Sequence, residues 1–151
     1  MSRQSYLYLA AGVLCVVWCA IPGSRAALAG DEVDVIVNKS NSIDALSLAD
    51  AKKIFDGDKG SWPNGKRITV IMLSQGHPAR DAVLRDIYKM GESDYGKYFM
   101  QAAFTGKVDA PPQDVSSDAD VKQQVTGNPG AIGYVNASDV DASVKVVLKL
   151  P

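Results

Sequence analysis

Short apolar runs alternate along this chain with stretches in which apolar residues recur every three or four positions. The apolar runs are typical of buried strands and predict four of them, at 34–37, 68–73, 131–135 and 144–150. The helical spacing predicts helices starting near 48, 78, 93 and 118, the second reaching about Met90. Strands separated by helices indicate an α/β fold: a single three-layer lobe with a mainly parallel sheet of about four or five strands.

Serines mark three of the predicted helix starts. Ser47 and Ser117 each precede an acidic residue by three positions, which is the pattern of a capping box, and Ser93 precedes the third helix. The segment 106–116 contains Pro111-Pro112 and is predicted to be irregular.

The first 29 residues have the pattern of a secretory signal peptide rather than of a folded segment. A basic residue, Arg3, precedes an apolar run from Tyr6 to Ile21, and Ala27-Leu28-Ala29 is a small-x-small cleavage site. A retained membrane anchor is the alternative, but this run is short for a spanning helix. We therefore predict a signal peptide at 1–29 and a single domain at 30–151.

Both cysteines, Cys15 and Cys19, fall inside the predicted signal peptide, so the domain has no disulfide and no thiolate ligand. An exported domain without disulfides indicates a bacterial periplasmic protein with no membrane insertion after cleavage. Without Arg3 and Arg25 the chain has 14 basic and 17 acidic residues, a net charge of −3. This balance gives no indication of a nucleic-acid or anionic-membrane partner.

The strongest candidate for chemistry is the turn between the strand at 68–73 and the helix that Pro78 opens. A helix start after a glycine-containing turn presents backbone N–H groups that favour an anion. We predict an oxyanion site here, and its candidate ligands are Ser74, Gln75, Gly76, His77 and Arg80. Arg80 is the stronger donor because it is always charged. The alternative is a solvated turn in which His77 caps the helix.

Other chemistry is not favoured. Ser74, His77 and Asp81 lie too close together along the chain for a catalytic triad, so we predict no enzyme. The segment from Asp56 begins like a calcium loop, but Arg67 stands at its twelfth position, which favours a helix-ending turn. One histidine and no cysteine in the domain predict no metal site and no cofactor. Trp62 is interpreted as a packing residue, with a partner contact as the alternative.

Several motifs resemble the periplasmic phosphate-binding proteins of ABC transporters, and they occur here in the same order and at similar spacing. They are Val35-Ile-Val-Asn-Lys39, Ser47-Leu-Ala-Asp-Ala-Lys-Lys-Ile-Phe-Asp-Gly57, Trp62-Pro-Asn-Gly65, Phe104-Thr-Gly106 and Asn128-Pro-Gly-Ala-Ile-Gly-Tyr-Val135. The resemblance covers nearly all of 30–151. It implies a periplasmic binding protein-like fold, but only one of the two lobes between which those proteins hold phosphate.

The phosphate loop of that family differs from the turn found here. Where the family has Arg-x-x-Gly-Ser-Gly-Thr, this chain keeps Gly76 but has Leu73, His77, Pro78 and Ala79 at the other defining positions. Two hypotheses follow. The first is a solute-binding domain for phosphate or another oxyanion that serves a transporter, with closure by a second copy in a homodimer. The second is a non-catalytic envelope interaction module that keeps the fold and has lost ligand binding.

Overall fold

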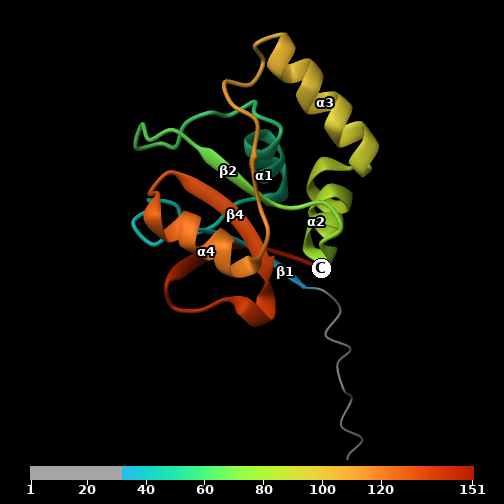
Figure 1. The fold of residues 1–151 in the computed structure, drawn as a ribbon. Helices are drawn as coiled ribbons and strands as arrows, with labels where there is room; N and C mark the ends of the chain where they lie inside the picture. The colour runs from blue at the N-terminus through green and yellow to red at the C-terminus, as the bar shows by residue number, and fades with distance from the viewer. Residues whose placement is uncertain (1–31) are drawn as a thin grey trace, which may run out of the picture.

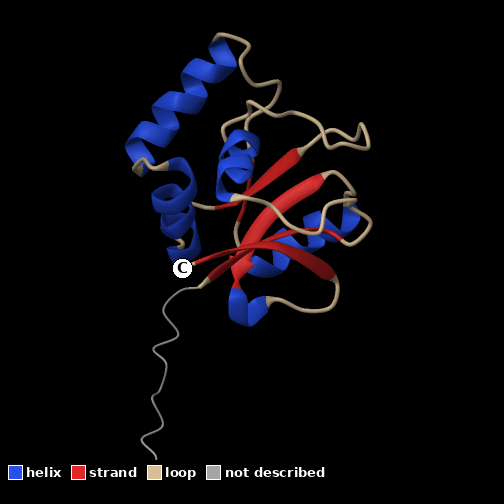
Figure 2. Ribbon diagram, turned by 180° about the vertical axis from the view of Figure 1, so that it is seen from behind, coloured by secondary structure: helices blue, strands red, loops and turns tan. Residues whose placement is uncertain are grey.

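A computed structural model describes residues 32–151 as a five-stranded sheet with helices on both faces (Figure 1, Figure 2). The predicted signal peptide, residues 1–29, lies outside the described residues. Within 32–151, no helix combines the length and the apolar character that crossing a membrane requires.

The four predicted strands are present, with small shifts at their ends. They are β1 (Val33–Asn38), β2 (Thr69–Leu73), β4 (Ala131–Asn136) and β5 (Val144–Leu150). The prediction that 106–116 is irregular throughout is wrong, because β3 (Gln113–Val115) lies within it. The hydrophobic pattern could not show β3, since this strand is short and largely exposed and depends on backbone pairing with β2.

The strand order is β3-β2-β4-β1-β5. β2 pairs in parallel with β3 and β4, whereas β1 is antiparallel to both β4 and β5. The α/β class and the number of strands are confirmed, but the sheet is mixed rather than mainly parallel. The sequence could not reveal this, because β1 is buried along its whole length, and a mostly apolar strand of this kind is found with parallel as well as antiparallel neighbours.

Four strands end at the same edge of the sheet, which we call the carboxyl edge. β2 and β4 are parallel, and β1 begins where β4 and β5 end, since Val33 is paired with both Asn136 and Leu150. The carboxyl ends of strands in open α/β sheets are where ligands usually bind. The turn that follows Leu73 lies at this edge.

The helices form the two outer layers. α4 (Asp118–Gly127) covers one face of the sheet, and α1 (Leu48–Phe55) and α2 (Pro78–Val83) cover the other (Figure 1, Figure 2). Ser47 and Ser117 accept hydrogen bonds from the backbone N–H three residues later, so both predicted caps are confirmed. The predicted Ser93 cap is wrong, because α3 (Glu92–Phe104) begins one residue earlier and Gly91 is its N-cap.

The helix predicted from Pro78 to about Met90 changes form along its length. After α2 it continues as a π-helix, η1 (Leu84–Tyr88), and ends at Lys89 in a left-handed conformation with φ 57°. The wider turn places Tyr88 in the core, where its hydroxyl donates to Phe55 O at 3.0 Å. The rings of Phe55, Tyr95 and Phe99 meet the Tyr88 ring edge to face. This aromatic cluster joins α1, η1 and α3.

Trp62 precedes β2 and is only 3% exposed. Its indole N–H donates to Gly130 O at 3.0 Å, which connects the 60–67 hairpin to the start of β4. The interpretation of Trp62 as a packing residue is therefore confirmed.

Asp34 is a buried carboxylate near the start of β1. It is 3% exposed, its Oδ1 has no hydrogen-bond partner among the described residues, and Lys149 Nζ lies 3.9 Å from its Oδ2. Burial raises the pKa of Asp34 above its ordinary value of 3.8, although the charge of Lys149 acts in the opposite direction. The folded state therefore holds this proton more tightly than the unfolded state.

We expect Asp34→Asn to stabilise the protein increasingly as pH rises from about 3 to about 7, because the wild type loses stability there as the buried carboxyl ionises. Urea unfolding across this pH range measures the difference. Asp94→Asn removes a carboxylate whose side chain is 70% exposed and serves as the control. If Asp34→Asn and Asp94→Asn change the free energy of unfolding by the same amount at every pH, then burial does not raise the pKa of Asp34.

Candidate functional site

The turn after β2 is held in place from the adjacent strand. The backbone N–H and the hydroxyl of Ser74 both donate to Val115 O, at 2.8 and 2.9 Å. His77 N–H then donates to Ser74 O at 3.3 Å, which closes a four-residue turn. Gly76, at the third position, has φ +89°, as a type II turn requires. The turn is thus a defined structure at the carboxyl edge, and Gly76 is needed for its backbone.

His77 is the N-cap of α2, which confirms the alternative interpretation of this residue. Its Nδ1 accepts the backbone N–H of Ala79 at 3.3 Å, and its Nε2 lies 3.2 Å from Asp118 Oδ2. With Nδ1 accepting, Nε2 carries the hydrogen that points to Asp118. Because both ring nitrogens are engaged, His77 offers no free nitrogen to act as a general base.

Arg80 lies beneath the turn rather than on its surface. The residue is 2% exposed, and its guanidinium donates to three groups from different parts of the chain. Nε and Nη2 bind the two carboxylate oxygens of Glu92 at 2.9 and 2.7 Å, and Nη1 binds Leu73 O at 2.6 Å and Asp114 Oδ1 at 3.1 Å. The guanidinium lies over the Tyr95 ring, with the Cζ atom of Arg80 4.8 Å from the centre of that ring. The protein's own carboxylates therefore surround Arg80 as a bound anion would.

The charge of Arg80 is stable in this position. Burial by itself lowers the pKa of Arg80, but the hydrogen bond with Glu92 and the charges of Asp114 and Glu92 outweigh it, so the pKa lies above its ordinary value. The paired carboxylates are partly exposed, at 29% for Glu92 and 57% for Asp114. Arg80 is thus neutralised within the domain before any ligand arrives.

Carboxylates outnumber cations around the turn. Asp114, Asp118 and Asp120 come from β3 and the first turn of α4, and Asp81 follows Arg80 on α2. Hydrogen bonds from the hydroxyls of Ser116 and Ser117 lower the pKa of Asp120, so this side chain is ionised near neutral pH. The electrostatic field at the turn therefore opposes the binding of an anion.

The prediction that the helix start offers free N–H groups is wrong for α2. Pro78 has no N–H, Ala79 donates to the His77 ring, and Arg80 and Asp81 donate to His77 O. The exposed donors that remain belong to the turn itself. The backbone N–H groups of Gln75 and Gly76 have no partner among residues 32–151.

Tyr134 supports the turn from β4, and sequence reasoning gave it no part in the site. Its buried hydroxyl accepts the backbone N–H of Leu73 at 3.0 Å, beyond the point where the backbone pairing of β2 with β4 ends. Burial raises the pKa of Tyr134, so the phenol stays protonated. The only sign in the sequence that this residue has a polar role was a tyrosine among the apolar residues of a predicted core strand.

The described residues contain no group of three or more His, Cys, Asp or Glu side chains arranged to hold a metal ion. Asp56, at the start of the calcium-loop-like segment, is the C-cap of α1 and accepts Lys52 Nζ at 2.7 Å. The interpretation of this segment as a helix-ending turn is therefore confirmed.

Solved structures of phosphate-binding proteins share this fold. A putative phosphate ABC transporter substrate-binding protein from Clostridium perfringens, solved with bound phosphate, is 27% identical, with a TM-score of 0.62 over 78% of this chain and 44% of that one. An ABC-type phosphate transport receptor from Vibrio cholerae is 20% identical, with a TM-score of 0.56 over 78% and 45%. PstS from Borrelia burgdorferi is 12% identical, with a TM-score of 0.60 over 78% and 46%.

No protein-family model and no curated protein matches the chain. The chain spans less than half the length of each solved structure described above. It therefore has the fold of part of a phosphate ABC transporter substrate-binding protein, and the resemblance that the motifs indicated is confirmed.

We expect Arg80→Ala to lower the free energy of unfolding by about 3 kcal/mol, because it leaves Glu92 and Asp114 without their buried partner. Arg80→Lys recovers only part of this loss, since an ammonium cannot make the two-point contact with Glu92. Hydrogen exchange of the α3 amides should also accelerate, because Glu92 anchors that helix.

Arg67→Ala is the matched control, because Arg67 is 65% exposed and pairs with the 80% exposed Asp109. Its effect on urea unfolding should stay below about 1 kcal/mol. Equal losses in Arg80→Ala and Arg67→Ala would contradict a structural role for the buried guanidinium.

Proposed function

We propose that this protein is a periplasmic solute-binding component of a phosphate-type transport system. In this proposal, phosphate or a similar oxyanion binds at the turn formed by Ser74, Gln75, Gly76 and His77, and Arg80 supports that turn from below. The observation that carries the proposal is the likeness of the fold to a phosphate transport protein that was solved with phosphate bound.

The geometry of the turn supports the same proposal. The backbone N–H groups of Gln75 and Gly76 have no acceptor among the described residues, and they lie at the edge where α/β sheets usually bind ligands. Arg80 fixes the strand end by donating to Leu73 O, and His77 fixes the helix start. In this proposal the two exposed N–H groups donate to the anion.

The proposed binding is weak in the isolated domain. The nearby carboxylates of Asp114 and Asp118 repel an anion, and the single turn supplies few donors. We therefore expect a Kd in the millimolar range, which corresponds to about −4 kcal/mol. A second protein surface, from the transporter or from a second copy of this chain, would complete the site.

The second candidate function is an envelope interaction module that has lost ligand binding. It is favoured by the internal pairing of two candidate ligands, since Arg80 contacts Glu92 and Asp114, and His77 contacts Asp118. In this case the carboxyl edge is a protein contact surface instead of half of a solute site.

Calorimetry of the purified protein with phosphate, sulfate and a nucleotide separates the two functions. We expect phosphate or sulfate to bind, and Gln75→Pro to weaken binding by about tenfold, because proline deletes one N–H at a turn position that prolines favour. Gln75→Ala keeps the N–H and is the control. The solute-binding proposal fails if no anion binds at about 10 mM, or if Gln75→Pro binds like the wild type.

Self-association through the turn is a separate part of the proposal. Sedimentation velocity at increasing protein concentration should show a dimer that phosphate strengthens, because each copy would contribute donors to a shared anion. A monomer at every concentration, with and without phosphate, would eliminate the second copy as the closing surface and leave the transporter.

A further inference from the structure

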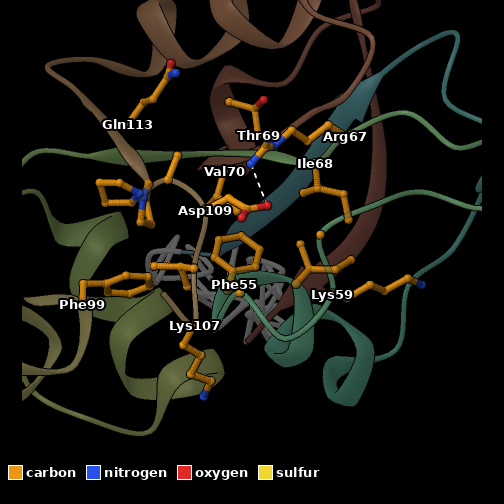
Figure 3. A pocket seen from close by; sticks show the side chains of 17 residues that line it. Phe55, Lys59, Arg67, Ile68, Thr69, Val70, Phe99, Lys107, Asp109 and Gln113 are labelled. Atoms are coloured by element: carbon orange, nitrogen blue, oxygen red, sulfur yellow. Dashed lines mark ion pairs between the residues drawn. The ribbon is translucent and has the colours of Figure 1, made fainter. Parts of the chain in front are cut away.

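A cavity at the end of the sheet opposite the carboxyl edge is lined by basic residues, which the Ser74–His77 turn lacks on its surface. Its volume is 280 Å³, and it lies where β2 and β3 begin, beneath the segment that connects α3 to β3 (Figure 3). Its lining includes the side chains of Phe55, Val70 and Phe99. It is therefore separate from the Ser74–His77 turn, which follows the opposite end of β2.

Cations predominate among the charged residues of the cavity. Lys59, Arg67 and Lys107 line it, whereas Asp109 is the one carboxylate in the lining. At the carboxyl edge, by contrast, acidic residues surround the turn. An anion is consequently stabilised at this cavity more than at the turn.

These cations are available to a ligand to different degrees. Lys59 has no ion pair with any described residue. Arg67 and Asp109 are paired at 2.7 Å beside the cavity, but their side chains are 65% and 80% exposed, so the pair is weak and exchanges readily (Figure 3). Lys107 is held by Asp58 at 3.2 Å and by the Tyr98 hydroxyl at 2.9 Å. Arg67 is thus the cation beside the cavity that a ligand can recruit (Figure 3). The ammonium of Lys59 points away from the other lining residues, so Lys59 joins it through a change of side-chain conformation.

The apolar floor determines what kind of anion fits. The rings of Phe55 and Phe99 lie at the bottom of the cavity with Val70 (Figure 3), and 1% of Phe55 and 7% of Phe99 is exposed. Inorganic phosphate cannot cover this surface, whereas a ring or short chain can, and its burial adds about 25 cal/mol for each Å². The volume corresponds to roughly nine water molecules, which suits a ligand of roughly ten non-hydrogen atoms.

We propose that this cavity is a second binding site, for a small organic anion that combines an apolar ring or chain with one carboxylate, sulfonate or phosphate monoester. The apolar part lies against Val70 and the part of the Phe99 ring that the cavity exposes. The anionic group pairs with Arg67, displacing Asp109, and with Lys59. The site is independent of phosphate binding at the turn.

Phenyl phosphate is a suitable probe, with inorganic phosphate and phenol as its two halves. Calorimetry with the purified protein should give a Kd for phenyl phosphate at least about tenfold lower than for either half, because both parts of the cavity are used. Lys59→Ala and Arg67→Ala should each weaken binding severalfold. Ala110→Trp, at the exposed rim, should abolish it by filling the cavity.

Lys53→Ala is the charge-matched control, because Lys53 lies on α1 outside the cavity and is 62% exposed. It should leave binding unchanged, and so should Gln75→Pro. Amide chemical shifts of Gly57 and Val108 should move on titration. The proposal is overturned if phenyl phosphate binds no more tightly than inorganic phosphate, if Ala110→Trp binds normally, or if Gln75→Pro removes the binding.

Discussion

A buried guanidinium is the constraint on which the arrangement of this domain depends. Placing the charge of Arg80 inside a protein costs free energy unless carboxylates and carbonyls surround it, and here Leu73, Asp114 and Glu92 do so. These groups come from β2, β3 and α3, so one side chain on α2 joins three other elements. The short strand β3 is also held by its pairing with β2, and α3 by the aromatic cluster around Tyr88. Arg80 adds a buried charged contact that connects both elements to α2.

The same constraint explains how an apparent ligand-binding motif becomes part of the structure. Sequence reasoning placed Arg80 among the exposed donors because a helix start after a glycine turn usually faces solvent. The acceptors that bury it, Glu92 and Asp114, lie 12 and 34 residues away. No local pattern could have paired them. His77 is similar, since its partner Asp118 belongs to a different helix.

What the sequence predicted well was local. Helix periodicity, the Ser47 and Ser117 caps, and the buried strands all depend on neighbouring residues, and the structure confirms them. One local feature was missed, namely that the ring and the carbonyl of His77 satisfy the N–H groups at the start of α2. The direction of β1 and the edge strand β3 were missed because they depend on contacts distant in sequence. The resemblance to phosphate-binding proteins succeeded for the fold for the same reason, because its motifs are core and turn positions.

Charge is distributed unevenly between the two ends of the sheet. Asp114 and Asp118 lie at the carboxyl edge, whereas Lys59 and Arg67 border the cavity at the opposite end. A protein with a small net charge can therefore have a dipolar surface. Such a domain takes a preferred orientation as it approaches a charged partner, even before any contact forms.

The pairing of Val33 with Leu150 brings the first and last strands of the domain side by side. Neighbouring strands lie about 4.8 Å apart, so a polypeptide entering at β1 and leaving at β5 passes through almost one point. A domain with this property can be placed in a surface loop of another protein without separating the two ends of that loop. It can also be circularly permuted, with a short linker joining β5 to β1 and new termini in the 60–67 hairpin. The architecture is thus modular, since its connection to the rest of a polypeptide requires no rearrangement of the sheet.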